Sequence, residues 1–315
     1  MSGLMTFDAN QVNTTGAFLV SELEKLDQTM HVPLYNVTWG RDINIRPDVA
    51  ITDKMSSFTL TDFATVGGAK ANGKNFISGK TTVIANVQVG TKKIALPLNL
   101  WALGLLYSII DLQSSIKLGR SIDATQHEGM RIKWQMDTDE QVYIGDKDMG
   151  VKGMLNLDGV PAINSAVSWM TATPDQIRDE ISSFLNEAWK NTGYSVCPAE
   201  LRIPPEVFSR LSSQIVSSAG NISLLKYLEE NTIANSINGK PLNIQPLKWC
   251  KGIGAAKKDR VMAYTNQTQF IRFPMVQLTS TPIQYVDLHQ KSIYYGALGA
   301  VEAVYPETIS YMDGV

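Results

Sequence analysis

The sequence predicts a globular α+β fold in about two domains. Its 315 residues are 44% hydrophobic and only 18% charged, so the chain can bury a core without disulfide or metal staples. Helical and strand-like stretches are segregated along the chain instead of alternating, which favours α+β over a doubly wound α/β sheet. At roughly 150 residues per domain, the length suggests two domains.

Net charge and cysteine usage exclude several classes of protein. The formal net charge is −2 and the pI is about 6.0, which argues against a basic nucleic-acid-binding protein. Cys197 and Cys250 match no metal-ligand spacing, so we expect two reduced thiols, as in a reducing cytoplasm. The most apolar stretch, residues 96–110, is interrupted by Pro97 and Asn99 and is shorter than the roughly 18–20 apolar residues of a membrane helix. We therefore expect no membrane segment.

The N-terminal third predicts a helix, an arm and a long β-hairpin. Apolar residues spaced four, three and four apart predict a helix over residues 17–30, because they share one helical face. A polar, extended arm with little to bury follows over residues 39–47. Residues around Phe58 predict a strand, and the β-branched residues of 81–89 predict its partner. A turn rich in Gly and Asn separates the two, and a second turn over residues 90–93 precedes another short strand. Together these segments predict an extended hairpin with a basic, mobile tip.

Two helices are expected next, over residues 100–118 and 123–142. The second is about 30 Å long at 1.5 Å per residue, yet it has few bulky apolar side chains, with Met130 and Trp134 on one side. A long helix with so thin an apolar stripe is typical of a strut that lies across a sheet or against a neighbouring chain.

The remaining sequence indicates a second domain that begins near Gly145. Residues 173–176, Thr-Pro-Asp-Gln, form a capping box with proline at the first helical position, so a helix starts there. The pair Pro204-Pro205 opens a shorter helix, and Asn221 or Ser223 caps a third. The chain then turns mostly to strands, over residues 268–273, 276–280 and 293–312.

No catalytic or cofactor motif is complete in this sequence. The nearest to a phosphate loop, Gly68-x-x-x-x-Gly73-Lys74-Asn75, lacks the Ser or Thr that would hold magnesium, and a strand-like run follows it where a helix is needed. The three histidines, at positions 31, 127 and 289, have no second ligand at metal spacing. We therefore expect no enzyme activity and no cofactor, which favours a structural protein.

The order of these parts resembles the Hong Kong phage-type shell fold, which tailed-phage major capsid proteins share with encapsulins. Residues 143–146, Tyr-Ile-Gly-Asp, and residues 150–156, Gly-Val-Lys-Gly-Met-Leu-Asn, are similar to the family's signature after its long helix. Residues 201–205 fit the family's second-domain strand that leads into a helix. The ending, residues 299–314, is similar to that of one subgroup of phage capsid proteins.

The resemblance implies a division of the chain into four parts. They are an N-terminal arm, an extended hairpin loop, a peripheral domain with the long spine helix, and an axial domain around the capsomer axis. The expected boundaries are residues 1–50 for the arm, 51–97 for the hairpin loop, 98–158 with 275–305 for the peripheral domain, and 159–274 with 306–315 for the axial domain.

The function that the resemblance implies is that of a major capsid protomer. Such a protomer assembles with itself into pentamers and hexamers of the icosahedral head of a tailed double-stranded DNA phage. We expect it in the virion after assembly in the host cytoplasm, with weak contact to packaged DNA on the inner face. A portal is a further expected partner, and a decoration protein is left open. Because no removable domain precedes the arm, we also expect a separate scaffolding protein.

The hairpin tip is the expected contact between subunits. Its glycines allow backbone angles that let the tip follow a neighbour's surface, and its lysines can meet carboxylates there. Some relatives crosslink a hairpin lysine to a neighbour's asparagine, but this sequence fixes neither the geometry nor the catalytic carboxylate of such a reaction. The expected contact residues are Gly67, Gly68, Lys70, Gly73, Lys74 and Asn75.

Two other functions stay open from the sequence alone. An encapsulin-type shell would enclose a cargo enzyme instead of a genome, and electron micrographs of native particles would separate it from a DNA-filled head. An unrecognised hydrolase would behave as a monomer in light scattering, which would separate it from both shells.

Overall fold

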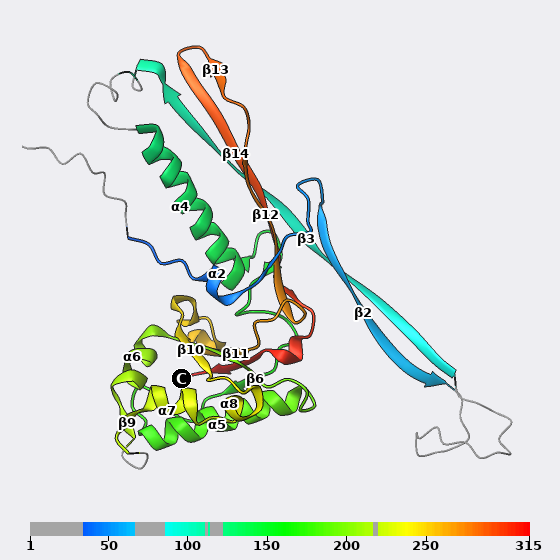
Figure 1. Ribbon diagram of the computed structural model, residues 1–315, viewed down its shortest axis with the longest axis vertical. Coiled ribbons are helices and arrows are strands. Elements are labelled where there is room, and N and C mark those ends of the chain that lie inside the picture. Colours follow the sequence, from blue (N-terminus) through cyan, green and yellow to red (C-terminus); the bar gives the residue numbers. More distant parts are fainter. Residues whose placement is uncertain (1–33, 67–85, 111–112, 114–121, 217–219) are drawn as a thin grey trace, which may run out of the picture.

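The computed structural model describes residues 34–66, 86–110, 113, 122–216 and 220–315 (Figure 1). The helix expected over residues 17–30 and the tip of the hairpin lie outside the described residues. Within the described part of the chain, the strands form two main sheets that occupy different regions of the molecule.

The larger sheet joins segments from the first third of the chain with segments from its C-terminal part. Within the described residues its main path runs β1-β12-β14-β3-β2, while β13 pairs with β14 and β15 pairs with β12. Among the described strands of this sheet, β1 and β12 are the one pair that runs parallel. The strands are β1 (Ile45–Arg46), β2 (Met55–Val66), β3 (Asn86–Ser108), β12 (Ile271–Ser280), β13 (Gln284–Val286), β14 (His289–Gly299) and β15 (Glu302–Ala303).

Helix α4 (Ile122–Tyr143) lies along this sheet and is the expected strut. Met130 and Trp134, the two apolar residues predicted to share one side, are buried with 2% and 4% of their surface exposed. The ring of Trp134 meets that of Trp101 in β3 edge to face, with centroids 5.0 Å apart. Met130 packs against Leu105 and Tyr107 of the same strand. The thin stripe therefore covers β3 within one chain.

The sequence interpretation was wrong about residues 90–108, which belong to one continuous strand, β3. The expected turn at 90–93 is absent, because Gly90 lies opposite Asp62 in the pairing with β2. The helix expected from Leu100 is also absent up to Ser108, because those residues pair with β14. A short apolar run fits a buried helix and a buried strand equally well, so here the pairing with β14 decides. Residues 111–112 and 114–118 lie outside the described residues.

Residues 39–47 also differ from the expected extended arm. They form a short helix, α2 (Trp39–Asp42), and the strand β1. Trp39 and Ile43 are buried in the apolar cluster that holds Trp134 and Tyr143 of α4. This segment is therefore anchored to the spine helix, and its buried side chains were overlooked because they are few and scattered among polar ones.

The second sheet has five strands in the described residues, in the order β10-β7-β11-β16-β6. Ile177, Ile181 and Phe184 of α5 pack with Leu201 and Ile203 of β7 in the larger apolar core. The strands are β6 (Ala162–Asn164), β7 (Glu200–Ile203), β10 (Asn243–Pro246), β11 (Arg260–Tyr264) and β16 (Ser310–Asp313), and the helices are α5 (Pro174–Asn191), α6 (Pro205–Ser213), α7 (Leu224–Glu230) and α8 (Ile233–Asn238). Short elements are β4 (Gly145–Asp146), β5 (Val151–Lys152), β8 (Ile215–Val216), β9 (Ile222–Ser223), η2 (Lys248–Cys250), η3 (Ala255–Lys257) and η4 (Pro306–Thr308).

The predicted helix starts in this region are confirmed. Thr173 Oγ1 accepts from the Gln176 N–H at 3.4 Å, and Gln176 Oε1 accepts from the Thr173 N–H at 3.0 Å, which completes the capping box of α5. Helix α6 begins at Pro205. Of the two candidates for the third cap, Ser223 caps α7 by accepting from the Lys226 N–H at 3.3 Å.

The glycine-rich junction after α4 has a steric explanation. Strands β4 and β5 form a tight antiparallel pair, and Gly145 has a φ of +76°. A Cβ atom on Gly153 would lie 2.3 Å from the carbonyl carbon of Tyr143. Asn156 closes the turn, because its Oδ1 accepts from the Gly153 N–H at 2.8 Å and its Nδ2 donates to the Ile144 carbonyl at 2.8 Å. The junction therefore requires glycine and asparagine at these positions.

The C-terminal strand β16 is held by a buried ion pair. Asp313 accepts from Arg260 Nε at 2.6 Å, from Arg260 Nη2 at 2.7 Å and from the Ala255 N–H at 2.9 Å. Burial by itself raises the pKa of Asp313, but the Arg260 and Ala255 hydrogen bonds outweigh it and the pKa lies below its ordinary value. The carboxylate therefore stabilises the folded chain only while it is ionised.

We expect Gly153→Ala to lower the free energy of unfolding of the protomer by about 1–3 kcal/mol, because the new methyl group overlaps backbone atoms of Tyr143. Gly129→Ala is the matched control. Gly129 lies within α4 and a Cβ there meets no atom within 4 Å, so the change should stabilise by roughly 0.5–1 kcal/mol. Urea unfolding of both variants measures the difference, and equal stabilities would contradict the steric explanation.

We expect Asp313→Asn to be less stable than the wild type at pH 7, by about 3–5 kcal/mol, because Arg260 loses its buried partner. A carboxylate whose pKa is lowered by folding stabilises the folded chain at pH values above its pKa in the unfolded chain, about 3.9. This stabilisation is lost as the pH falls through its lower pKa in the folded chain. The gap between variant and wild type should therefore close below about pH 4. Urea unfolding at pH values from 7 to 2 measures the difference in free energy of unfolding between the two proteins. A difference that does not change with pH would contradict the ion pair between Asp313 and Arg260.

Candidate assembly surface

The six residues predicted to contact a neighbouring subunit, Gly67, Gly68, Lys70, Gly73, Lys74 and Asn75, lie outside the described residues. The structure describes the stem that carries them. This stem is β2 together with the first part of β3, paired in register from Met55 opposite Pro97 to Val66 opposite Asn86. We call this two-stranded segment the ribbon.

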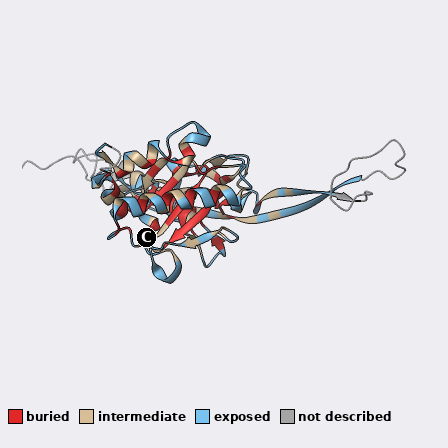
Figure 2. Ribbon diagram, turned by 90° about the horizontal axis from the view of Figure 1, so that it is seen from below, coloured by how far each residue is buried: buried red, intermediate tan, exposed pale blue. Residues whose placement is uncertain are grey.

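The ribbon leaves the body of the molecule as a free arm (Figures 1 and 2). Twelve residues in each strand give a length of about 40 Å at 3.3 Å per residue. A two-stranded ribbon has no core of its own and is marginally stable in water at best. Its far half therefore needs a surface to lie on, and the described part of its own chain provides none there.

Exposed apolar side chains gather on one face of that far half. Phe63 and Val89 lie directly opposite each other, with 74% and 56% of their surface exposed, and Val87 next to them is 64% exposed. Large side chains of this kind are normally buried in a soluble chain. We call these three residues the stem patch, and we regard it as the strongest sign of a partner surface on the ribbon.

A buried carboxylate fixes the ribbon to the body. Glu302 of β15 is fully buried and accepts from Arg46 Nη1 at 3.0 Å, from Arg272 Nε at 2.6 Å and from the hydroxyl of Ser56 in β2. Arg46 also donates to the carbonyl of Ser57 at 3.1 Å. One carboxylate thus ties β1, β12 and β15 to the base of β2.

A second buried carboxylate joins residues 39–47 to α4 and to the second sheet. Asp42 of α2 is fully buried and accepts from Arg202 Nε of β7 at 2.8 Å and from the hydroxyl of Tyr143 at the end of α4. Burial, and then the charge of Asp42, raise the pKa of Tyr143, so this phenol keeps its proton and donates it. Tyr264 of β11 donates to the Asp42 carbonyl at 2.8 Å.

Asp139 of α4 is a third buried carboxylate, and it binds the segment that leads into α2. Its side chain is fully buried and accepts from the N–H groups of Thr38 and Trp39 at 2.8 and 3.0 Å. It also accepts from Trp249 Nε1 at 2.7 Å and pairs with Lys248 at 3.1 Å. The segment before α2 therefore folds back onto the C-terminal part of α4.

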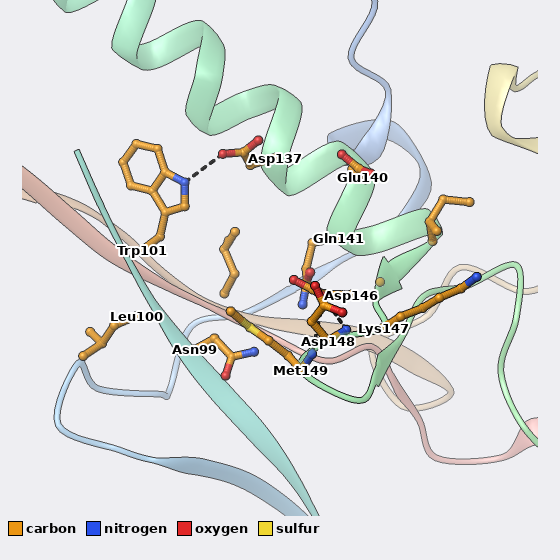
Figure 3. A pocket seen from close by; sticks show the side chains of 13 residues that line it. Asn99, Leu100, Trp101, Asp137, Glu140, Gln141, Asp146, Lys147, Asp148 and Met149 are labelled. Carbon is orange, nitrogen blue, oxygen red and sulfur yellow. Dashed lines mark hydrogen bonds between the residues drawn. The ribbon is translucent and has the colours of Figure 1, made fainter.

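A groove lies where β3 leaves the ribbon and passes the C-terminal end of α4 (Figure 3). Its volume is about 610 Å³. Trp101 donates to Asp137 at 2.9 Å on one side, while Asp146 at the end of β4 and Asp148 in the turn that follows approach from the other. We call it the β3–α4 groove and define it by Asn99, Leu100, Glu140, Asp146, Asp148 and Met149.

Sequence reasoning missed the buried carboxylates and Arg202. The signal was present, because Arg202 stands between Leu201 and Ile203, and Glu302 stands between Val301 and Ala303. A charged residue flanked by apolar ones within a strand indicates a buried ion pair. Among the described residues no group of His, Cys, Asp and Glu side chains could hold a metal ion.

Comparison with known proteins decides the family. A model of the major capsid protein family matches residues 73–315. This chain belongs to the major capsid protein family. No curated protein matches the sequence.

Solved structures agree with the family assignment. The capsid of Myoviridae phage XM1 superposes with a TM-score of 0.76 at 13% identity, over 94% of this chain and 98% of that one. A chain from Mycobacterium phage Che8 superposes with a TM-score of 0.58 at 13% identity, over 92% of this chain and 96% of that one. A chain of a virus-like particle from Pyrococcus furiosus superposes with a TM-score of 0.51 at 15% identity, over 87% of this chain and 91% of that one. The chain therefore has the Hong Kong phage-type capsid fold, as the resemblance implied.

The protein is a structural capsid protomer, and its place is the capsid of the virion. The encapsulin and hydrolase alternatives are not favoured, because the family model describes major capsid proteins. No helix in the described ranges is both long and apolar enough to cross a bilayer.

We expect Glu302→Gln to lower the free energy of unfolding by about 3 kcal/mol, because Arg46 and Arg272 lose a shared buried carboxylate. Hydrogen exchange of the backbone amides of Ser56 and Ser57 should be faster in this variant, since both residues bond to the Glu302–Arg46 pair. Glu187→Gln on the exposed face of α5 is the control and should stay within about 0.5 kcal/mol of the wild type. Equal effects of the two changes would refute a fixed ribbon base.

Proposed function

We propose that this protomer builds the closed icosahedral head of a tailed double-stranded DNA phage, from pentamers and hexamers of itself. The stem patch is the observation that carries the proposal, because three exposed apolar side chains on a free ribbon need a neighbour. Family membership supports the same conclusion.

We also propose the division into an arm, a hairpin loop, a peripheral domain and an axial domain. Membership of the two sheets supports it: β12, β14 and β15 join β3 in the larger sheet, whereas β6, β7, β10, β11 and β16 form the other. Helix α4 covers the larger sheet and helices α5–α8 pack with the second. The hairpin loop begins at the ribbon base that Glu302 holds.

The remaining partners and properties are proposals that rest on the family resemblance. A separate scaffolding protein and a portal take part in assembly in the host cytoplasm, and a decoration protein is left open. Packaged DNA touches the inner face weakly, consistent with a net charge of −2. The protomer itself catalyses no reaction.

The direct test of the proposed function is assembly. We expect the full chain, expressed with the scaffolding protein of its native source, to form closed shells in negative-stain electron microscopy and to sediment as large particles. Persistent monomers at high concentration, with and without that scaffold, would refute the proposal.

We expect deletion of residues 68–74 to leave a folded protomer that fails to form stable shells, because the tip contacts a neighbour. Circular dichroism and urea unfolding monitor folding, and sedimentation monitors shells. Lys70→Ala with Lys74→Ala is the milder companion variant, and it should weaken shells through lost ion pairs of about 0–1 kcal/mol each. An unfolded deletion variant, combined with unaffected shells in the double variant, would show that the tip belongs to the core.

A further inference from the structure

A short segment between β10 and β11 carries a high density of positive charge. Residues 248–260 contain four lysines, one arginine and one aspartate, a net charge of +4 in a chain of −2. The segment runs from η2 through η3 to the first residue of β11, and we call it the lysine loop. Positive charge concentrated in so few residues attracts anions to that part of the surface.

Two of the five cations in the lysine loop hold the fold together. Arg260 pairs with Asp313 at 2.6 Å, and Lys248 pairs with Asp139 at 3.1 Å. Both carboxylates are buried, so each needs its cation to remain in place. The charge that a ligand can use must therefore come from the other three cations.

Those three cations, Lys251, Lys257 and Lys258, are exposed. Lys257 and Lys258 form no ion pair within the described residues. Lys251 lies 2.5 Å from a carboxylate oxygen of Glu206, but the two side chains are 60% and 54% exposed. An ion pair so open to water contributes little, so Lys251 can exchange Glu206 for another anion. Three ammonium groups are thus free to meet a partner.

Backbone contacts bring these lysines onto one tight turn. The Gly252 N–H donates to Asp259 Oδ1 at 2.9 Å, and the Gly254 N–H donates to the Lys258 carbonyl at 2.8 Å. A Cβ atom on Gly252 would lie 3.8 Å from the carbonyl oxygen of Lys257, so the two sides of the turn are adjacent. The three lysine side chains therefore start from neighbouring positions of the backbone.

The same turn has a strained backbone. Ala256 and Lys257 have φ angles of 55° and 59°, in the left-handed region that residues other than glycine rarely adopt. Such conformations persist only where the surroundings enforce them, and they are common at ligand sites. Here the Ala255 N–H donates to Asp313 at 2.9 Å and anchors the turn to β16. The fold thus maintains a costly conformation at a lysine without an ion-pair partner in the described chain, as expected where that lysine binds a ligand.

The composition of the lysine loop favours phosphate groups over a protein surface as its ligand. Its larger apolar residues are buried or half-buried, namely Trp249, Cys250 and Ile253. Protein interfaces need an apolar centre and are depleted in lysine. Non-specific binding of nucleic acid needs only cations that neutralise backbone phosphates. Exposed lysines on a turn of glycine and alanine meet that requirement.

The hairpin loop is the other basic region, with a net charge of +4 over residues 55–97. Lys92 and Lys93 are consecutive in β3, so their side chains leave on opposite faces of the ribbon. A duplex that lies on one face would meet one of these two lysines. The lysine loop places the same net charge in less than a third of that length, which makes it the better candidate.

We propose that the lysine loop binds the phosphate backbone of double-stranded DNA through Lys251, Lys257 and Lys258, without reading its sequence. This inference rests on the proposed function, which supplies a packaged duplex, and it names the residues that touch that duplex. Three exposed cations bind weakly in one protomer, and the many copies in a shell act together on one DNA molecule.

Binding of the full-length protomer to a labelled duplex of about 30 bp, measured by fluorescence anisotropy at several salt concentrations, tests the proposal. The loop variant combines Lys251→Ala, Lys257→Ala and Lys258→Ala. It should bind at least ~10-fold more weakly at low salt, because the phosphates lose their cations. The slope of log K against log [salt] should also become shallower by about 1 for each lysine removed.

Two further variants separate the loop from net charge and from folding. The charge control removes three exposed lysines elsewhere, by Lys190→Ala, Lys226→Ala and Lys240→Ala, and should keep the affinity within about 3-fold of the wild type. Arginine at the three loop positions keeps the charge and should also bind within about 3-fold. Equal losses in the loop variant and the charge control, or an unchanged slope in the loop variant, would overturn the proposal.

An acidic protein segment is the alternative ligand, and polyglutamate is its probe. We expect the duplex to lose more affinity than polyglutamate in the loop variant, because a duplex presents phosphates at closer spacing along its axis. Polyglutamate binding that depends on the loop, combined with duplex binding that does not, would show that the partner is a protein and that the proposal is wrong.

Shell formation separates this inference from the proposed function. The loop variant should form shells with a yield within about 3-fold of the wild type, because these lysines have no proposed part in contacts between copies. Normal shells together with unchanged duplex affinity would overturn the inference and leave the proposed function intact. Persistent monomers of the wild type would refute the proposed function, whatever the affinity for DNA.

Photocrosslinking in DNA-filled particles gives an independent readout. Lys257→Cys, labelled with an azidophenacyl group, should attach covalently to packaged DNA on illumination. The native Cys197 and Cys250 are both buried, and burial raises the pKa of Cys197 to about 11, so neither competes for the label. Lys240→Cys, at an exposed position after α8, is the matched control. Crosslinking from the control alone would overturn the proposal.

Discussion

One strand, β3, belongs to both the free ribbon and the packed sheet, and the rest of the architecture depends on this continuity. In the described part of the chain its first part pairs with β2 alone, while residues 98–108 pair with β14 and contact α4. The hydrogen-bonded ladder therefore passes from an unsupported segment into a supported one without a break. Because the sheet fixes the direction of β3, it also fixes the direction in which the ribbon projects.

Buried carboxylates hold this framework together at points where distant segments meet. Glu302 joins β15 to the ribbon base, Asp42 joins the arm segment to β7 and α4, and Asp139 anchors the chain before α2. A buried charge is tolerated only when several donors surround it, so each site specifies one arrangement of its neighbours. Such sites favour a single orientation of the ribbon, which a repeated interface in a shell requires.

Apolar and charged groups on the surface of the protomer have different effects on association. The stem patch supplies area that must leave water, and such burial stabilises association without fixing direction. Charge is unevenly distributed along the chain, because residues 55–97 carry a net charge of +4 and the remaining residues carry −6. Copies of such a chain can attract each other even though the net charge is only −2.

The sequence by itself determined the α+β class, the long amphipathic strut, the hairpin and the starts of α5, α6 and α7, because periodicity, proline and capping residues act over a few neighbours. The order of these parts was enough to suggest the family. The sequence did not determine that residues 90–108 form one strand, since an apolar run suits helix and strand alike until β14 pairs with it. Nor did it place Glu302 and Asp42 in the interior, because their partners are far apart in the chain and only the tertiary fold brings them together.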